Sequence, residues 1–416
     1  MITTNQQTTL LDHKRTFDRQ GWVIIPGLLS DSNREALKTE MIKTMLDTVF
    51  TRRGVNIDTN NPENLKLLTD PKLRKRTLSN PGGIWRNNNT RDPIVGKTTG
   101  MINIHFNAMI LEKIALNPSL YQVLSTLYGK INSETGQLQP MINLVHSEGP
   151  ERFSIKAKGS TKMPQHIDAN LFYPEVNYPL RIQSFYCVNT DSQINPSDSG
   201  TIAVLDNFCF YFALLGGICH PRYGIHPFPE NKSRFFSLPK KFDSEWLPKL
   251  NQIVKLYTEF FHRGVVSTDQ RIQTRFEQLK KSGRSVPNQF MEMKWKVIRL
   301  QPGDFFCWSQ CLPHYSCRNK SETPRMVCYY SLYPVSNTWY NSYHNQWTKE
   351  MFLNRIFYYS TNAGECLKKT KNPEEYQYLK TLGDENLTKY QNWIKSDPLR
   401  AKLTGLESWF PSTTQT

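Results

Sequence analysis

The sequence lacks several features that would place it in a familiar class of protein. No apolar run approaches the roughly 20 residues that a membrane-spanning helix needs. The first residues contain no apolar segment of the secretory type, so we expect an intracellular protein without a membrane span. Internal repeats and low-complexity tracts are absent as well.

Cysteines are too few and too irregularly spaced for a disulfide framework. The chain has eight in 416 residues. Four of them crowd into residues 307–328, but their spacing does not match a zinc finger, and the segment alternates like β-strands. We therefore expect buried or half-buried free thiols in a reducing compartment, at positions 187, 209, 219, 307, 311, 317, 328 and 366.

Acidic residues are outnumbered, 36 against 52 lysines and arginines, and the formal net charge is +16. Residues 72–76 (KLRKR) form a compact basic run, and residues 207–291 hold 13 basic against 6 acidic residues. Two interpretations stay open. The charge either keeps the surface solvated or attracts an anionic partner, such as nucleic acid, a phosphorylated molecule or an acidic protein.

What is present indicates a globular protein: 38% of the residues are hydrophobic and 12% are aromatic. The N-terminal segment predicts helix, strand and helix, with the strand at WVII and Ser30 as the N-cap of a helix that runs to about Phe50. Residues 51–100 are polar and predict a surface loop, and residues 107–128 regain the helical period.

From residue 139 the pattern changes to short strands separated by turn residues. Eight strands are the number that a jelly roll needs to close two sheets over one core. An interruption of some 85 residues, basic and helical in pattern, separates the fourth strand from the fifth, and a helical tail follows residue 340. We predict the strands at 139–147, 163–168, 180–189, 201–206, 294–300, 304–309, 313–318 and 325–334.

One set of residues has the types and the order that a metal site requires. His166 and Asp168 stand two positions apart, a spacing that is weak evidence alone, but His314 supplies a third ligand at the start of a later strand. Two histidines and a carboxylate on one face of a metal leave open positions, an arrangement suited to Fe(II). Eleven residues after His314, Arg325 offers a planar charged fork for a carboxylate, and Ser316 offers a hydroxyl.

With these residues the chain resembles the Fe(II)/2-oxoglutarate-dependent dioxygenases, and within them the phytanoyl-CoA dioxygenase-like group. Three features carry the resemblance: the segment F-x-x-x-G-W-V-I-I-P-G-L-L-S from Phe17, H-I-D together with S-G-T-I-A-V-L at 199–205, and P-G-D…H-Y-S…R ending at Arg325. They cover residues 17–38, 139–206 and 294–334, less than half of the chain.

The resemblance implies a mainly β, α+β fold: a double-stranded β-helix (jelly roll, cupin-like) with flanking helices. We therefore expect a single catalytic domain with four parts. These are a helical support region at 1–138, the β-core at 139–206 and 292–338, a basic insertion and candidate substrate lid at 207–291, and a helical extension at 339–416.

The resemblance also implies a site. His166, Asp168 and His314 would bind Fe(II), and Arg325 with Ser316 would hold the distal carboxylate of the cosubstrate 2-oxoglutarate. Gln139 or Asn143 would add a polar contact from the first core strand, and Phe185 would be the aromatic residue of the third. O2 would be the second cosubstrate, with ascorbate in support.

The implied reaction is hydroxylation of a C–H bond, with release of succinate and CO2. Related halogenases replace the iron-binding carboxylate with a small residue, whereas this chain keeps Asp168. The substrate stays open among small molecules, nucleic acid and protein side chains, and the basic insertion favours a phosphorylated or polyanionic one.

Two alternatives come from other classes. One is a nucleic-acid-binding protein with a vestigial oxygenase fold, and the other is a cupin-type metal enzyme that does not use 2-oxoglutarate. The histidines outside the triad have no ordered partners, so even the pair His220 and His226 predicts no second metal site. The aromatic cluster at 339–347 is typical of a packing surface more than of a base-stacking platform.

Overall fold

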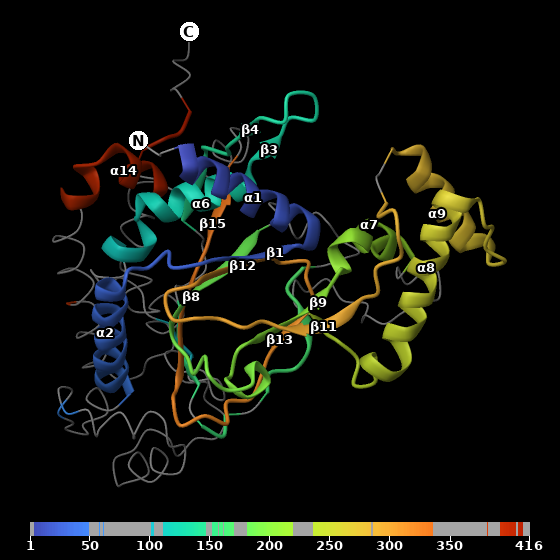
Figure 1. Ribbon diagram of the computed structural model, residues 1–416. Helices are drawn as coiled ribbons and strands as arrows, with labels where there is room; N and C mark the ends of the chain where they lie inside the picture. The colour runs from blue at the N-terminus through green and yellow to red at the C-terminus, as the bar shows by residue number, and fades with distance from the viewer. Residues whose placement is uncertain are drawn as a thin grey trace.

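The computed structural model describes most of the N-terminal segment and the β-rich part of the chain (Figure 1). The described residues are 4–49, 58, 61, 101–103, 111–146, 152–156, 158–160, 162–169, 181–218, 236–283, 286–335, 381, 392–404 and 407–410. Nearly all of the predicted surface loop at 51–100 and most of the tail after 340 therefore lie outside the described residues.

The N-terminal segment folds as helix, strand and helix, as the sequence predicts: α1 (Thr4–Gln20), β1 (Trp22–Ile25) and α2 (Asp31–Val49). Gly21 makes the turn into β1 with φ at +78°, and a Cβ built there would lie 2.2 Å from the sulfur of Cys209. Only glycine fits such a position. The hydroxyl of Ser30 accepts a hydrogen bond from the backbone N–H of Asn33 at 3.4 Å, so Ser30 caps α2.

A six-stranded antiparallel sheet forms the larger of the two main β-layers, in the order β1-β12-β8-β14-β6-β2. Sequence-distant segments thus become neighbours: β1 pairs with β12 and β14 with both β8 and β6. The strands besides β1 are β2 (Met101–Asn103), β6 (Arg152–Lys156), β8 (Ile182–Asn189), β12 (Phe305–Ser309) and β14 (Arg325–Tyr330).

A five-stranded antiparallel sheet faces it, in the order β10-β7-β13-β9-β11. Side chains of both sheets share one apolar cluster, for example Phe185 and Phe306 from the large sheet and Val204 from the small one. The two layers form the double-stranded β-helix that the sequence predicts. The strands of the small sheet are β7 (His166–Ile167), β9 (Ile202–Asp206), β10 (Phe236–Ser237), β11 (Lys294–Val297) and β13 (His314–Ser316).

The large sheet is buried on both faces, because its strands alternate between two clusters. Phe305 and Cys307 of β12 belong to a cluster with the N-terminal helices, whereas Phe306 and Trp308 belong to the cluster shared with the small sheet. In the first cluster lie Leu37 of α2 and residues of η4 (Leu111–Ala115) and α6 (Pro118–Tyr128). Near-continuous burial of β8 and β14 follows from this arrangement.

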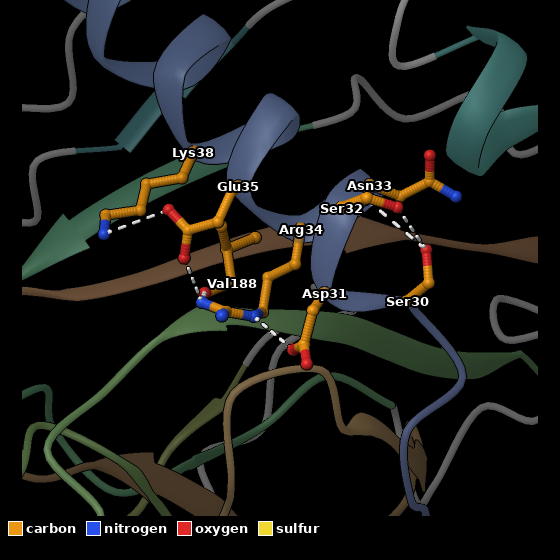
Figure 2. A network of polar contacts seen from close by, with 8 residues as sticks. All are labelled: Ser30, Asp31, Ser32, Asn33, Arg34, Glu35, Lys38 and Val188. Carbon is orange, nitrogen blue, oxygen red and sulfur yellow. Dashed lines mark hydrogen bonds and ion pairs between the residues drawn. The ribbon is translucent and has the colours of Figure 1, made fainter.

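Arg34 fastens α2 to the large sheet (Figure 2). Its Nη1 lies 3.5 Å from the carbonyl oxygen of Val188 in β8 and 2.7 Å from Glu35, and its Nε lies 3.3 Å from Asp31. The guanidinium is thereby held by two carboxylates of its own helix while it contacts the strand.

The strand predicted at 139–147 is wrong as a strand of the main sheets. Pro140 has no N–H to donate to a ladder and divides the segment into β4 (Leu138–Gln139) and β5 (Leu144–His146). β4 pairs with β3 (Lys130–Ile131) and β5 with β15 (Leu332–Pro334), each pair forming a separate two-stranded sheet. The place beside β14 belongs to β6, which the sequence analysis missed.

Within residues 207–291 the described part is mainly helical, as predicted: α7 (Phe208–Ile218), η8 (Phe242–Trp246), α8 (Leu247–Arg263) and α9 (Gln270–Lys281). Figure 1 shows α8 and α9 at the opposite side of the molecule from α2. The segment also contributes β10 to the small sheet, next to β7. Further described helices are η6 (Pro196–Asp198) and α14 (Pro398–Thr404), and residues 392–395 are helical as well. Among the described residues, every helix is too short or too polar to cross a bilayer.

Candidate metal centre

Two short strands of the small sheet bring the predicted histidines together. His314 of β13 is the direct cross-strand partner of His166 in β7, so both side chains point to the same face of the sheet. Their ring centroids lie 4.2 Å apart. Asp168 follows β7 two residues after His166 and returns to the same face. The ladder between β7 and β13 therefore determines the spacing of the two imidazoles.

The three side chains offer ligand atoms that all lie within 4.8 Å of one another, as a metal ion requires. The Asp168 carboxylate lies near the Nε2 atoms of both rings, with Oδ1 at 3.9 Å from His166 Nε2 and Oδ2 at 3.6 Å from His314 Nε2. Across the described residues, this triad is the one group of three or more His, Cys, Asp or Glu side chains so arranged.

Backbone carbonyls fix the tautomer of both imidazoles. His166 Nδ1 lies 2.8 Å from the carbonyl oxygen of Pro164, and His314 Nδ1 lies 2.9 Å from that of Leu312. A carbonyl can only accept, so each Nδ1 carries the proton and each Nε2 keeps its lone pair for a metal. The turns that precede β7 and β13 are thus part of the site.

Burial, and next to it the neighbouring His166, lowers the pKa of His314. Both effects disfavour the charged imidazolium. Because only the neutral ring can bind a metal, this environment keeps His314 in its ligand form at neutral pH.

Gln183 of β8 supports the carboxylate from the opposite sheet. Its side-chain amide donates a hydrogen bond of 2.6 Å from Nε2 to Oδ2 of Asp168. The amide oxygen of Gln183 is buried and has no hydrogen-bond partner. The sequence analysis did not identify this residue, because nothing in the local pattern of β8 connects it with Asp168.

A pair of buried cations lies between the sheets. Arg325 of β14 and Lys156 of β6 are direct cross-strand partners, and each is only 2% exposed. The Arg325 guanidinium lies over the ring of Phe185, 4.9 Å from its centroid, and its Nε and Nη1 are buried without a hydrogen-bond partner. Buried donors of this kind are rare in native proteins and indicate a missing acceptor.

Lys156 connects the cation pair with the strand of His314. Its Nζ donates hydrogen bonds of 2.7 Å to Ser316 Oγ and 2.8 Å to the carbonyl oxygen of Cys317. Ser316 and His314 share one face of β13, about 7 Å apart along the strand. Burial, and next to it the Arg325 charge, lowers the pKa of Lys156 to about 7. The cations and the triad therefore face the same space between the sheets.

Lys156 was also missed, although a signal for it was present. Residues 153–156 read F-S-I-K, and the alternation puts Lys156 with Ser154 on the face opposite Phe153 and Ile155. A lysine at the interior end of such a strand needs an anionic partner.

The other predicted site residues lie elsewhere or are outside the described part. Gln139 is exposed on β4, and Asn143 precedes β5, so neither belongs to the two main sheets. Their contact with a cosubstrate stays a prediction. His220, His226 and the aromatic cluster at 339–347 lie outside the described residues. Cys187, Cys209, Cys307, Cys311, Cys317 and Cys328 are free thiols, in agreement with the expectation.

Comparison with known proteins gives structural neighbours only: no family model matches the sequence, and no curated protein matches it. SnoN, described as a non-heme alpha ketoglutarate dependent epimerase from nogalamycin biosynthesis, aligns over 79% of this chain and 84% of its own, with 10% identity and a TM-score of 0.37. HygX from Streptomyces hygroscopicus, crystallised with nickel and 2-oxoglutarate, aligns over 80% and 88%, with 12% identity and a TM-score of 0.38. AviO1 from Streptomyces viridochromogenes Tue57 aligns over 80% and 98%, with 12% identity and a TM-score of 0.37.

Proposed function

We propose that the chain is a non-haem Fe(II)- and 2-oxoglutarate-dependent dioxygenase that hydroxylates a C–H bond. The observation that carries the proposal is the combination of the His166–Asp168–His314 triad with Arg325, whose buried Nε and Nη1 have no hydrogen-bond partner. The triad fits a divalent metal that keeps open positions. Arg325 fits the carboxylate of a second ligand beside that metal.

Each residue of the site has a task in this chemistry. His166, Asp168 and His314 would hold the metal, and Arg325, Lys156 and Ser316 would hold the distal carboxylate of 2-oxoglutarate. Phe185, which is fully buried under the guanidinium, excludes water from that ion pair and strengthens it. When bound together, Fe(II) and 2-oxoglutarate supply the activation of O2 for C–H oxidation, with succinate and CO2 as coproducts.

Succinate release with Fe(II), 2-oxoglutarate and ascorbate, screened against pools of substrates, tests the proposal. The wild type should release succinate, and His166→Ala should not. Arg325→Met should raise the KM for 2-oxoglutarate, whereas Arg299→Met, which removes an exposed arginine of the same molecule, should leave it unchanged. Substrate turnover that needs no 2-oxoglutarate and survives Arg325→Met would identify the cupin-type alternative.

The mass of the product tests hydroxylation. A gain of one oxygen atom is expected, whereas a product of unchanged mass would indicate epimerisation and a loss of two hydrogens would indicate cyclisation. A wild-type protein that neither binds a divalent metal nor turns over 2-oxoglutarate would support a vestigial fold and contradict the proposal.

We further propose a phosphorylated or otherwise anionic substrate. The insertion brings β10 beside the strand of His166. Two exposed lysines follow two residues after β10: Lys240, and Lys241, which also forms an ion pair of 2.7 Å with Glu245. Phosphate-bearing members of the substrate pool should be preferred, and their KM should rise with ionic strength because salt screens exposed charges. A best substrate without charge, or a KM independent of salt, would contradict this assignment.

A further inference from the structure

The Gln183–Asp168 hydrogen bond joins the metal-binding face of the small sheet to the large sheet. Gln183 lies on β8, which pairs with β12 on one side and β14 on the other. Its cross-strand partner Trp308 packs its ring edge-to-face against His314, with 5.4 Å between centroids. The Gln183 side chain therefore projects from a central strand of the large sheet, and the adjacent strand β12 also contacts the triad through Trp308.

The orientation of the Gln183 amide is determined by Asp168. Nε2 donates to the carboxylate at 2.6 Å, and a rotation of the amide by 180° would place two oxygens against each other. The orientation leaves Oε1 buried without a partner, a cost that a purely structural glutamine would avoid. The hydrogen bond to the carboxylate thus outweighs the loss at the other end of the amide.

The distances to the imidazoles do not distinguish the two oxygens of Asp168, since Oδ1 lies 3.9 Å from one ring nitrogen and Oδ2 lies 3.6 Å from the other. The hydrogen bond from Gln183 does distinguish them, because it uses one lone pair of Oδ2 and makes Oδ1 the stronger donor to a metal. A carboxylate that used both oxygens would take a position on the metal that a chelating cosubstrate or O2 needs.

We propose that Gln183 is a positioning residue that keeps Asp168 a one-oxygen metal ligand. The inference rests on the proposed metal centre, but not on the identity of the substrate. Outer partners of this kind orient a ligand, and their removal weakens metal binding by about 10- to 100-fold.

Binding of Co(II) to the metal-free protein tests the inference without any assay of turnover. Gln183→Leu and the shorter Gln183→Asn both remove the donor from reach of Asp168. Each should raise the Kd for Co(II) by about 10- to 100-fold. Each should also change the visible absorption of the bound Co(II), which reports the number and arrangement of its ligands.

Gln165→Leu is the matched control. Gln165 directly precedes His166 and donates a hydrogen bond of 2.9 Å to Asp243, so it forms another glutamine–aspartate pair beside the same strand. Alternation along the strand directs it away from the triad. Its loss should leave both the Kd for Co(II) and the absorption spectrum unchanged.

The outcomes separate the inference from the proposed function. A wild type that binds no Co(II) would overturn the metal centre and the inference with it. Wild-type affinity and an unchanged spectrum in both Gln183 variants would overturn the inference alone. Equal losses in the Gln183 and Gln165 variants would show a general disturbance of β7 and also overturn it. Thermal unfolding of the metal-free variants verifies that each is folded, and the two Gln183 substitutions are judged by whichever folds.

Discussion

At the scale of single residues, the buried cations Arg325 and Lys156 are the feature that most constrains the site. Two positive charges placed opposite each other on adjacent strands repel, and burial adds a desolvation cost to both. The sign of the Lys156 contribution follows from its pKa, which falls from 10.5 to about 7 in the folded chain. The cost is fully present below pH 7 and diminishes as the pH rises towards 10.5, because the unfolded chain alone stays protonated in that window.

Binding of 2-oxoglutarate should therefore depend on pH through Lys156. Above about pH 7 the free protein loses the Lys156 proton that a carboxylate needs, so the Kd should rise by up to about tenfold for each pH unit. Lys156→Arg stays charged and should remove that slope, and Lys156→Met should bind weakly at every pH. Calorimetric titration of 2-oxoglutarate in the presence of Mn(II) measures all three profiles. Three parallel profiles would contradict the role of Lys156.

The meeting of the three triad residues was predictable from sequence, because a metal site requires particular residue types in a fixed order. His166, Asp168, His314 and Arg325 are recognisable as a set, although each is unremarkable alone. Gln183 was not predicted, because its importance depends on a contact between the sheets that only the fold creates. For Lys156 the alternation of F-S-I-K indicates an inward-facing lysine, but its hydrogen bond to Ser316 depends on the fold. Sequence spacing carries no information about such partners.

At the scale of elements, helix α9 of the insertion begins at a well-formed cap. Asp269 Oδ1 accepts hydrogen bonds from the backbone N–H groups of Arg271 at 2.9 Å and Ile272 at 3.4 Å. The side chain of Arg271, next to these amides, lowers the pKa of Asp269 to about 2. Because the pKa is depressed, the stabilisation is present above pH 4 and is lost as the pH falls through 2.

Asp269→Ala should lower the free energy of unfolding by about 1 kcal/mol, the usual value of an N-cap. Asp269→Asn keeps an acceptor and should lose less. Urea unfolding at neutral pH compares the two variants with the wild type. Equal stability of Asp269→Ala and the wild type would show that the cap does not limit the stability of the insertion.

The elements themselves were predicted to different degrees. The helix–strand–helix start and seven of the expected strand segments lie where hydrophobic periodicity places them, and the final segment divides into β14 and β15. β10 has only two residues, too few for an alternating pattern to be recognised. β6 does alternate, as F-S-I-K at residues 153–156, but the segment is short and was not assigned as a strand. The segment at 139–147 has the pattern of a single strand, but Pro140 has no backbone N–H to donate and interrupts it.

At the scale of the whole molecule, the large sheet separates two clusters of described hydrophobic residues, of which only one contacts the triad. The cluster on the helical side contains Leu124, Phe153 and Met326, and the cluster on the other side surrounds the triad with Phe306 and Trp308. Substitutions on the helical side should therefore change stability without changing metal binding, whereas substitutions on the other side can change both.

Leu124→Ala should lower the free energy of unfolding by about 2–5 kcal/mol, the usual cost of a large buried cavity, and leave the Kd for Co(II) unchanged. Phe306→Ala should affect both quantities, because its ring stacks on Trp308 at 5.4 Å and Trp308 contacts His314. Chemical unfolding and Co(II) titration of both variants measure the separation. A metal affinity that falls in Leu124→Ala would contradict it.

The pairing of β10 with β7 bears on any attempt to shorten this protein. The backbone of His166 lies between Ser237 on one side and His314 on the other, and Leu238 donates a further hydrogen bond to Gln165. A truncated version without residues 207–291 would leave the strand of His166 as an edge strand, unpaired on that side and open to association with other chains. A shortened variant of the protein must therefore retain residues 236–238, or include another strand that pairs with this edge of β7.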